Sequence, residues 1–88
     1  MRQYKELFQH FLLDEVKAFR AKRELSQEAM AEILCVEPRS YFDMEHGNYG
    51  FSSTSLVLFL LALEEGEVQQ FLKDFRDLVE RTDQNDIA

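Results

Sequence analysis

The sequence predicts an all-α fold, a single domain of five helices. Three observations lead to this prediction. Apolar residues recur at three- and four-residue steps along most of the chain, no stretch alternates as a β-strand does, and 45% of the 88 residues are hydrophobic, with eight Phe among them. A chain of this length builds one hydrophobic core. We therefore predict one domain over residues 1–82 and a frayed tail at 83–88.

The first three helices follow from apolar spacing and from residues that begin or end a helix. The first is predicted over residues 3–23, where apolar residues form one stripe. Ser26 starts the second, because its hydroxyl can accept a hydrogen bond from an unpaired backbone N–H. The third is predicted over residues 37–45, since Pro38 suits a first helical turn and Gly47 can end the helix in a left-handed conformation.

Two further helices are predicted after the loop "GNYGFSS". The fourth, "SLVLFLLALEE", is capped by one of Ser52, Ser53 and Thr54. It is apolar on nearly all sides, which predicts that it is the central buried helix. Gly66 separates it from the fifth, "EVQQFLKDFRDLVERT", whose apolar stripe is formed by Val68, Phe71, Leu72, Phe75, Leu78 and Val79.

The charge of the chain bears on its partners. A net charge of −7 argues against a strongly basic nucleic-acid binder, but the charge is uneven. Residues 1–47 carry 7 basic and 9 acidic groups, a net of −2, whereas residues 48–88 carry 3 basic and 8 acidic groups, a net of −5. The acidic excess lies mainly in the C-terminal part, so the charge alone leaves nucleic-acid binding open.

Other classes of protein are disfavoured by composition. The single cysteine, Cys35, excludes a disulfide framework and a Cys-rich zinc site, and it is predicted to be a small buried thiol in a reducing compartment. The longest apolar run, Leu56–Leu63, is too short to span a bilayer, and no secretory leader is recognised. We expect a cytoplasmic protein without a membrane partner. With no nucleophile motif, phosphate loop or metal-ligand spacing, we expect neither an enzyme nor a cofactor.

Three stretches follow one another between residues 25 and 63: "LSQEAMAEILCV", "PRSYFDMEHG" and the apolar "LVLFLLAL". With these stretches, residues 13–63 resemble the Xre or lambda-repressor-like helix-turn-helix family, many members of which are bacterial and phage transcriptional regulators. The family's twenty-residue unit corresponds to residues 27–46. The resemblance implies a five-helix lambda-repressor-like DNA-binding domain. Residues 1–12 and 64–88 lie outside it, as an extension of the first helix and an added C-terminal helix.

The resemblance also implies roles for individual residues. Arg20 and Glu45 match positions that form a partly buried salt bridge between the first and third helices in several members. Gln27 matches a position that touches backbone phosphate. On the third helix Arg39 is the best candidate to contact a base, because arginine can donate to both acceptors of guanine, and Ser40 could bond a phosphate or a base. The candidate DNA-binding residues are Gln27, Pro38, Arg39, Ser40, Phe42, Asp43, Lys22, Arg23 and Asn48.

Some residues of this unit fit DNA binding less well. Phe42 could contact a thymine methyl or, equally, a protein partner. Asp43 could accept from a cytosine amine but otherwise repels phosphate, and Glu37 adds a second negative charge to the same face. Cys35 stands in the turn that glycine usually occupies, which predicts modest left-handed strain. We therefore expect weak binding by one protomer, with a shallow salt dependence.

Four phenylalanines in the flanking helices are candidates for a dimer interface or for the core: Phe8, Phe11, Phe71 and Phe75. They could pack together and also form a homodimer, or they could only complete the core of the monomer. A dimer would multiply two weak half-site contacts. The sequence thus predicts a homodimer that binds specific sequences of double-stranded DNA and regulates transcription. The alternative is a protein-interaction module, such as an antitoxin or accessory regulator, that retains the scaffold without strong DNA binding.

Overall fold

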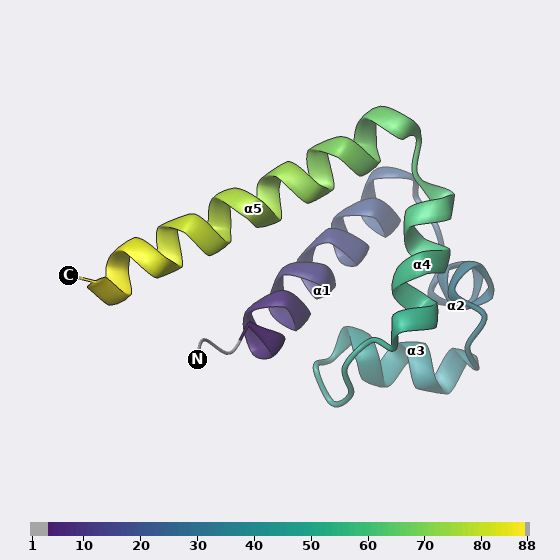
Figure 1. Ribbon diagram of the computed structural model, residues 1–88. Helices are drawn as coiled ribbons and strands as arrows, with labels where there is room; N and C mark the ends of the chain where they lie inside the picture. The colour runs from purple at the N-terminus through teal and green to yellow at the C-terminus, as the bar shows by residue number, and fades with distance from the viewer. Residues whose placement is uncertain (1–3, 88) are drawn as a thin grey trace.

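The computed structural model describes the backbone of residues 4–87 and the side chains of residues 4–84. This part of the chain contains five helices and no strand, which confirms the predicted all-α class (Figure 1). The helices are α1 (Lys5–Lys22), α2 (Gln27–Leu34), α3 (Pro38–Glu45), α4 (Ser53–Ala62) and α5 (Glu65–Ile87). None of these helices is both long enough and apolar enough to cross a bilayer.

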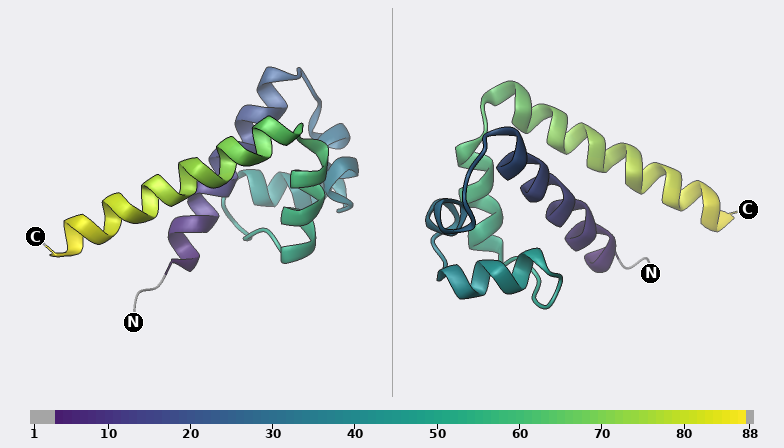
Figure 2. Two further views of the ribbon diagram at one scale, coloured as in Figure 1. Left: turned by 45° about the horizontal axis from the view of Figure 1, so that its top comes forward. Right: turned by 180° about the vertical axis from the view of Figure 1, so that it is seen from behind.

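The helices form two groups. The short helices α2, α3 and α4 gather at one end of the molecule, and the long helices α1 and α5 lie side by side (Figures 1 and 2). The buried side chains of both groups form one hydrophobic core. Its most buried members are Leu12, Val16, Phe19, Met30, Ala31, Leu34, Tyr41, Met44, Phe51, Phe59 and Phe71.

Aromatic rings join α1 to α5. Phe8 and Phe11 of α1 each contact Phe71 and Phe75 of α5, with ring centroids 5.1–6.4 Å apart. Such edge-on and tilted pairs are favourable beyond the area that they bury. The four phenylalanines therefore pack together within one chain, and the predicted homodimer interface stays a prediction.

Local signals fix most ends of the short helices as expected, but α4 ends at Ala62 instead of Glu65, and Gly66 lies in the first turn of α5 instead of between the two helices. Ser26 Oγ accepts a hydrogen bond from the backbone N–H of Ala29 at 3.0 Å, and Ser52 caps α4 in the same way. Pro38 lies in the first turn of α3, and Gly47 follows the helix with a φ of 79°. Cys35 ends α2 in the left-handed region, with φ 58° and ψ 45°, so the strain predicted at this turn is present.

Two predictions about burial are wrong. Cys35 is exposed, because it is the C-cap residue beyond the last inward-facing position of α2. Helix α4 is not buried on all sides: Val57 and Leu61 expose 54% and 75% of their surface. Only one side of α4 packs on the core, and after α4 the chain turns away along α1 as α5 (Figure 1). Periodicity could not show this, because a helix that is apolar on every side has no sequence signal for its covered side.

The predicted frayed tail at residues 83–88 is corrected for residues 83–87, because α5 continues to Ile87, while Ala88 lies outside the described residues. No glycine or proline interrupts "RTDQNDI", so nothing in the local sequence ends the helix. A long-range bond also holds this part of α5. The Tyr4 hydroxyl donates to Asp83 Oδ1 at 2.7 Å, which links the start of the described chain to its last helix.

Candidate nucleic-acid interface

Helix α3 is fixed by an ion pair with α1. Arg20 donates from Nε to Glu45 Oε2 and from Nη2 to Glu45 Oε1, both at 2.8 Å. The Glu45 side chain is only 8% exposed and that of Arg20 is 28% exposed. The predicted salt bridge is therefore present in a two-bond geometry that restricts orientation as well as distance. A third Arg20 bond, from Nη1 to the carbonyl of Leu25 at 3.1 Å, ties the same guanidinium to the α1–α2 turn.

Glu45 collects two more donors. The Tyr41 hydroxyl donates to Glu45 Oε2, and Gln27 Nε2 donates to Glu45 Oε1 at 3.2 Å. Burial by itself would raise the pKa of Glu45, but the hydrogen bonds from Arg20, Tyr41 and Gln27 outweigh it and hold that pKa below its usual value. Burial, followed by the bond to the Glu45 carboxylate, raises the pKa of the Tyr41 hydroxyl, which stays protonated and donates.

The Gln27 side chain makes a contact that the sequence did not predict. The sequence predicted a phosphate ligand at the start of α2, whereas the half-buried side chain bonds Glu45. This bond uses one hydrogen of the amide and leaves a second hydrogen for another acceptor. Gln27 is thus first a structural link between α2 and α3.

The outward side of α3 is led by Arg39, whose side chain is 84% exposed. Pro38 beside it is exposed, and Ser40 is half-buried. Arg39 Nε lies 3.6 Å from Asp43 Oδ2, one turn along the same helix. A pair this long, with its guanidinium in solvent, is weak, so Arg39 can leave Asp43 for a stronger acceptor.

Phe42 and Asp43 are also held by neighbours. Phe42 is 40% exposed and stacks on His46, with ring centroids 4.1 Å apart, and His46 Nδ1 lies 2.8 Å from the Phe42 carbonyl. Asn48 donates to Asp43 Oδ1 at 3.5 Å, and its backbone N–H donates to the Asp43 carbonyl at 2.8 Å. The structure thus brings Arg39, Phe42, Asp43 and Asn48 together at one surface.

Lys22 and Arg23 do not join this surface, contrary to expectation. Both line a groove between α1 and α5. Arg23 Nη2 is 2.9 Å from Glu67 Oε1, and its guanidinium carbon lies 4.0 Å from the centroid of the Phe19 ring. Their positions at the C-terminal end of α1 were clear from the sequence, but the direction in which their side chains point depends on where α5 packs.

The side-chain pairs that order this surface were not predicted from the sequence. In three of these pairs the two residues are four positions apart, the spacing at which side chains on one helix meet: Arg39 with Asp43, Tyr41 with Glu45, and Phe42 with His46. That spacing could have revealed them. Gln9 could not have been found in this way. Its side chain accepts from the backbone N–H of Phe51 at 2.7 Å and donates to the carbonyl of Phe51 at 3.1 Å, which anchors the α3–α4 loop to α1 across 42 positions.

A metal site receives no support from the described part of the chain. Among those residues, no group of three or more His, Cys, Asp or Glu side chains could hold a metal ion. Comparisons with models of protein families, with curated proteins and with solved structures find no match.

Proposed function

We propose that the chain binds double-stranded DNA as a lambda-repressor-like helix-turn-helix protein and regulates transcription in a bacterium or a phage. In this proposal α3 enters the major groove and α2 lies behind it. The observation that carries the proposal is the exposed Arg39 on a helix whose opposite side is fixed by Glu45. Base recognition needs a donor that is free on its outer side and a helix held at a set angle.

The charge arrangement supports weak rather than tight binding. Asp43 is flanked by Arg39 and Asn48, so part of its repulsion of phosphate is offset, while Glu37 remains exposed without an ion pair among the described residues. Lys22 and Arg23 lie in the groove between α1 and α5, which leaves few cations for phosphate contacts. Affinity should therefore fall only moderately with salt, since the slope follows the number of phosphates neutralised.

A homodimer is part of the proposal, because two linked protomers would multiply two weak contacts. The four phenylalanines of α1 and α5 contact one another within the monomer, so an interface that relied on them would have only their outer edges to use. Light scattering after size exclusion tests the dimer. A strict monomer at high concentration would contradict this part.

A second candidate is a protein-interaction module. It is favoured by the apolar side chains of Val57 and Leu61, which lie exposed on α4 in a chain of net charge −7. Exposed apolar patches often mark protein contacts. Retention of the chain on random duplex DNA at low salt separates the two candidates, because the interaction module predicts none.

Selection from a random duplex library at low salt is the experiment that tests the proposed function. We expect enrichment of a short motif that includes a guanine, since arginine pairs with the O6 and N7 acceptors of that base. If the folded chain enriched no sequence, the proposal would be abandoned in favour of the interaction module.

A further inference from the structure

A groove of about 260 Å³ lies between α1 and α5, next to the end of α4. Three buried rings form its base, one from each of these helices: Phe19, Phe59 and Phe71 are 7%, 2% and 5% exposed. Phe59 contacts both of the others edge-on, with centroids 5.4 and 6.0 Å away. The base is therefore apolar and continuous with the core, and it exposes only small parts of these rings.

One end of the groove is acidic and uncompensated. Glu15 of α1 and Asp74 of α5 both line it and are both half-buried. Within the described residues neither carboxylate forms an ion pair; Asp74 accepts only from Gln70 Nε2, at 2.7 Å. Burial, then repulsion from Asp74 and from Asp14, raises the pKa of Glu15. Two like charges that line the same partly buried groove are costly unless a cation joins them.

At the other end of the groove, the Arg23 guanidinium already has partners. Arg23 lies over the Phe19 ring, bonds Glu67 at 2.9 Å and approaches the carbonyl of Ala62 at 3.4 Å. Lys22 is exposed at the same rim. The basic groups of this end are partly matched by Glu67, so an anionic ligand gains little there and would meet Glu15 and Asp74 at the opposite end.

We propose that this groove binds a small organic cation with a flat apolar body, which packs against Phe59 and Phe71 and places its protonated amine between Glu15 and Asp74. The apolar body loses water against the base of the groove. The ammonium group donates to both carboxylates. The volume lies just below the usual range of about 300–1,000 Å³, so the ligand is a small one. This site does not depend on the proposed DNA function.

Calorimetric titration at pH 7 with three probes of similar shape tests the proposal: phenethylamine, 2-phenylethanol and phenylacetate. Phenethylamine should bind saturably and in preference to the neutral alcohol, and phenylacetate should bind weakest. Amide NMR signals that shift should belong to residues 15–23, 59–63 and 67–74. Equal binding of amine and carboxylate, no saturable binding of the amine, or shifts confined to other residues would overturn the proposal.

Two isosteric variants locate the charge contact. Glu15→Gln and Asp74→Asn should each lower the affinity for phenethylamine about fivefold, as the loss of one ion pair predicts. Asp77→Asn is the matched control, because it removes the same charge from α5 at a position that does not line this groove. An equal loss in Asp77→Asn would show that only the net charge matters and would contradict the site. Thermal melts confirm folding, which both groove variants should keep, since each relieves repulsion.

Discussion

At the scale of single residues, Glu45 is the centre of the proposed DNA-binding unit. Its carboxylate receives bonds from α1 through Arg20, from α2 through Gln27 and from α3 itself through Tyr41. A carboxylate with several donors is stabilised in its charged form, and it fixes the elements that supply them. An acidic residue that first appears unsuited to the helix proposed to contact DNA is therefore part of the support of that helix.

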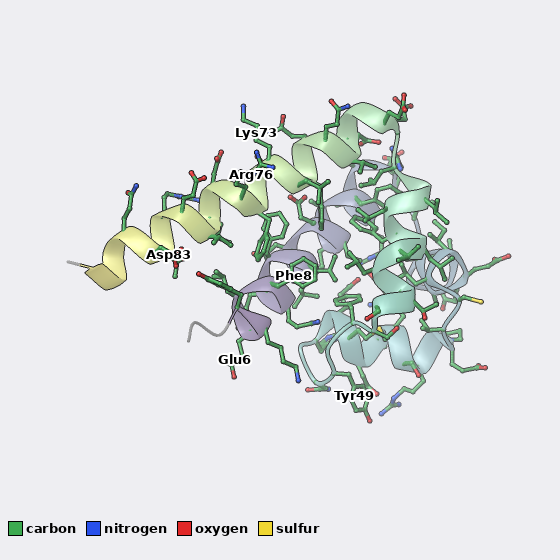
Figure 3. The ribbon with its side chains drawn as sticks, viewed as in Figure 1. Glu6, Phe8, Tyr49, Lys73, Arg76 and Asp83 are labelled. Carbon is green, nitrogen blue, oxygen red and sulfur yellow. The ribbon has the colours of Figure 1, made fainter. Side chains whose placement is uncertain are left out.

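Arg20→Ala should destabilise the chain. It leaves Glu45 buried with only the neutral donors Tyr41 and Gln27, which costs about 2–4 kcal/mol in the free energy of unfolding. Urea denaturation measures the change, with Arg76→Ala on the outer side of α5 as a control (Figure 3). An unchanged midpoint in Arg20→Ala would show that the pair contributes nothing to stability.

Glu15→Gln should stabilise the chain at neutral pH. The folded chain holds the Glu15 proton more tightly than the unfolded chain, because burial and the charges of Asp74 and Asp14 raise the pKa of this group. The free energy of unfolding therefore falls as the pH rises from the ordinary pKa to the raised one. The variant avoids this loss and should gain about 0.5 kcal/mol at pH 7 and almost nothing below about pH 4.

Denaturation at the two pH values checks this prediction. Glu80→Gln, on an exposed position of α5, is the matched control and should show no such difference. A gain for Glu15→Gln of the same size at both pH values would mean that its cause is not the ionisation of Glu15.

At the scale of elements, local signals predicted helix boundaries better than helix environments. Ser26, Pro38 and Gly47 act on their own backbone neighbours, so their effects were visible in the sequence. The sequence did not show which side of α4 is exposed, because this depends on which other helices pack against α4. The bond from Gln27 to Glu45, 18 positions away, and the turn of Arg23 toward Glu67, 44 positions away, likewise arise only from the packing of helices.

The α2–α3 turn offers a test at this scale. Cys35 holds a left-handed conformation that costs a non-glycine residue about 1–2 kcal/mol, and its exposed side chain contributes no core packing. Cys35→Gly removes this strain but adds flexibility to the unfolded chain. The net result should be a gain of about 0.5 kcal/mol in unfolding free energy, measured by urea denaturation. A loss of stability would show that the thiol makes a favourable contact.

At the scale of the whole molecule, α1 joins the two groups of helices. Its first half packs on α5 through Phe8 and Phe11, and its second half carries Arg20, which holds α3. The class of fold and the number of helices could be predicted from periodicity and length. The groove between α1 and α5 could not be predicted, because Glu15 and Asp74 line the same groove only when the two long helices pack side by side.

The most direct test of the central proposal compares Arg39→Ala with Arg76→Ala in binding to a selected duplex at low salt. Both variants remove one exposed arginine, but only Arg39 lies on the outward side of α3. We expect Arg39→Ala to lower the affinity by about 5- to 150-fold, the equivalent of one arginine–guanine contact, with unchanged stability. Arg76→Ala should lower it by less than about twofold. Equal affinities of the two variants would contradict DNA recognition by α3.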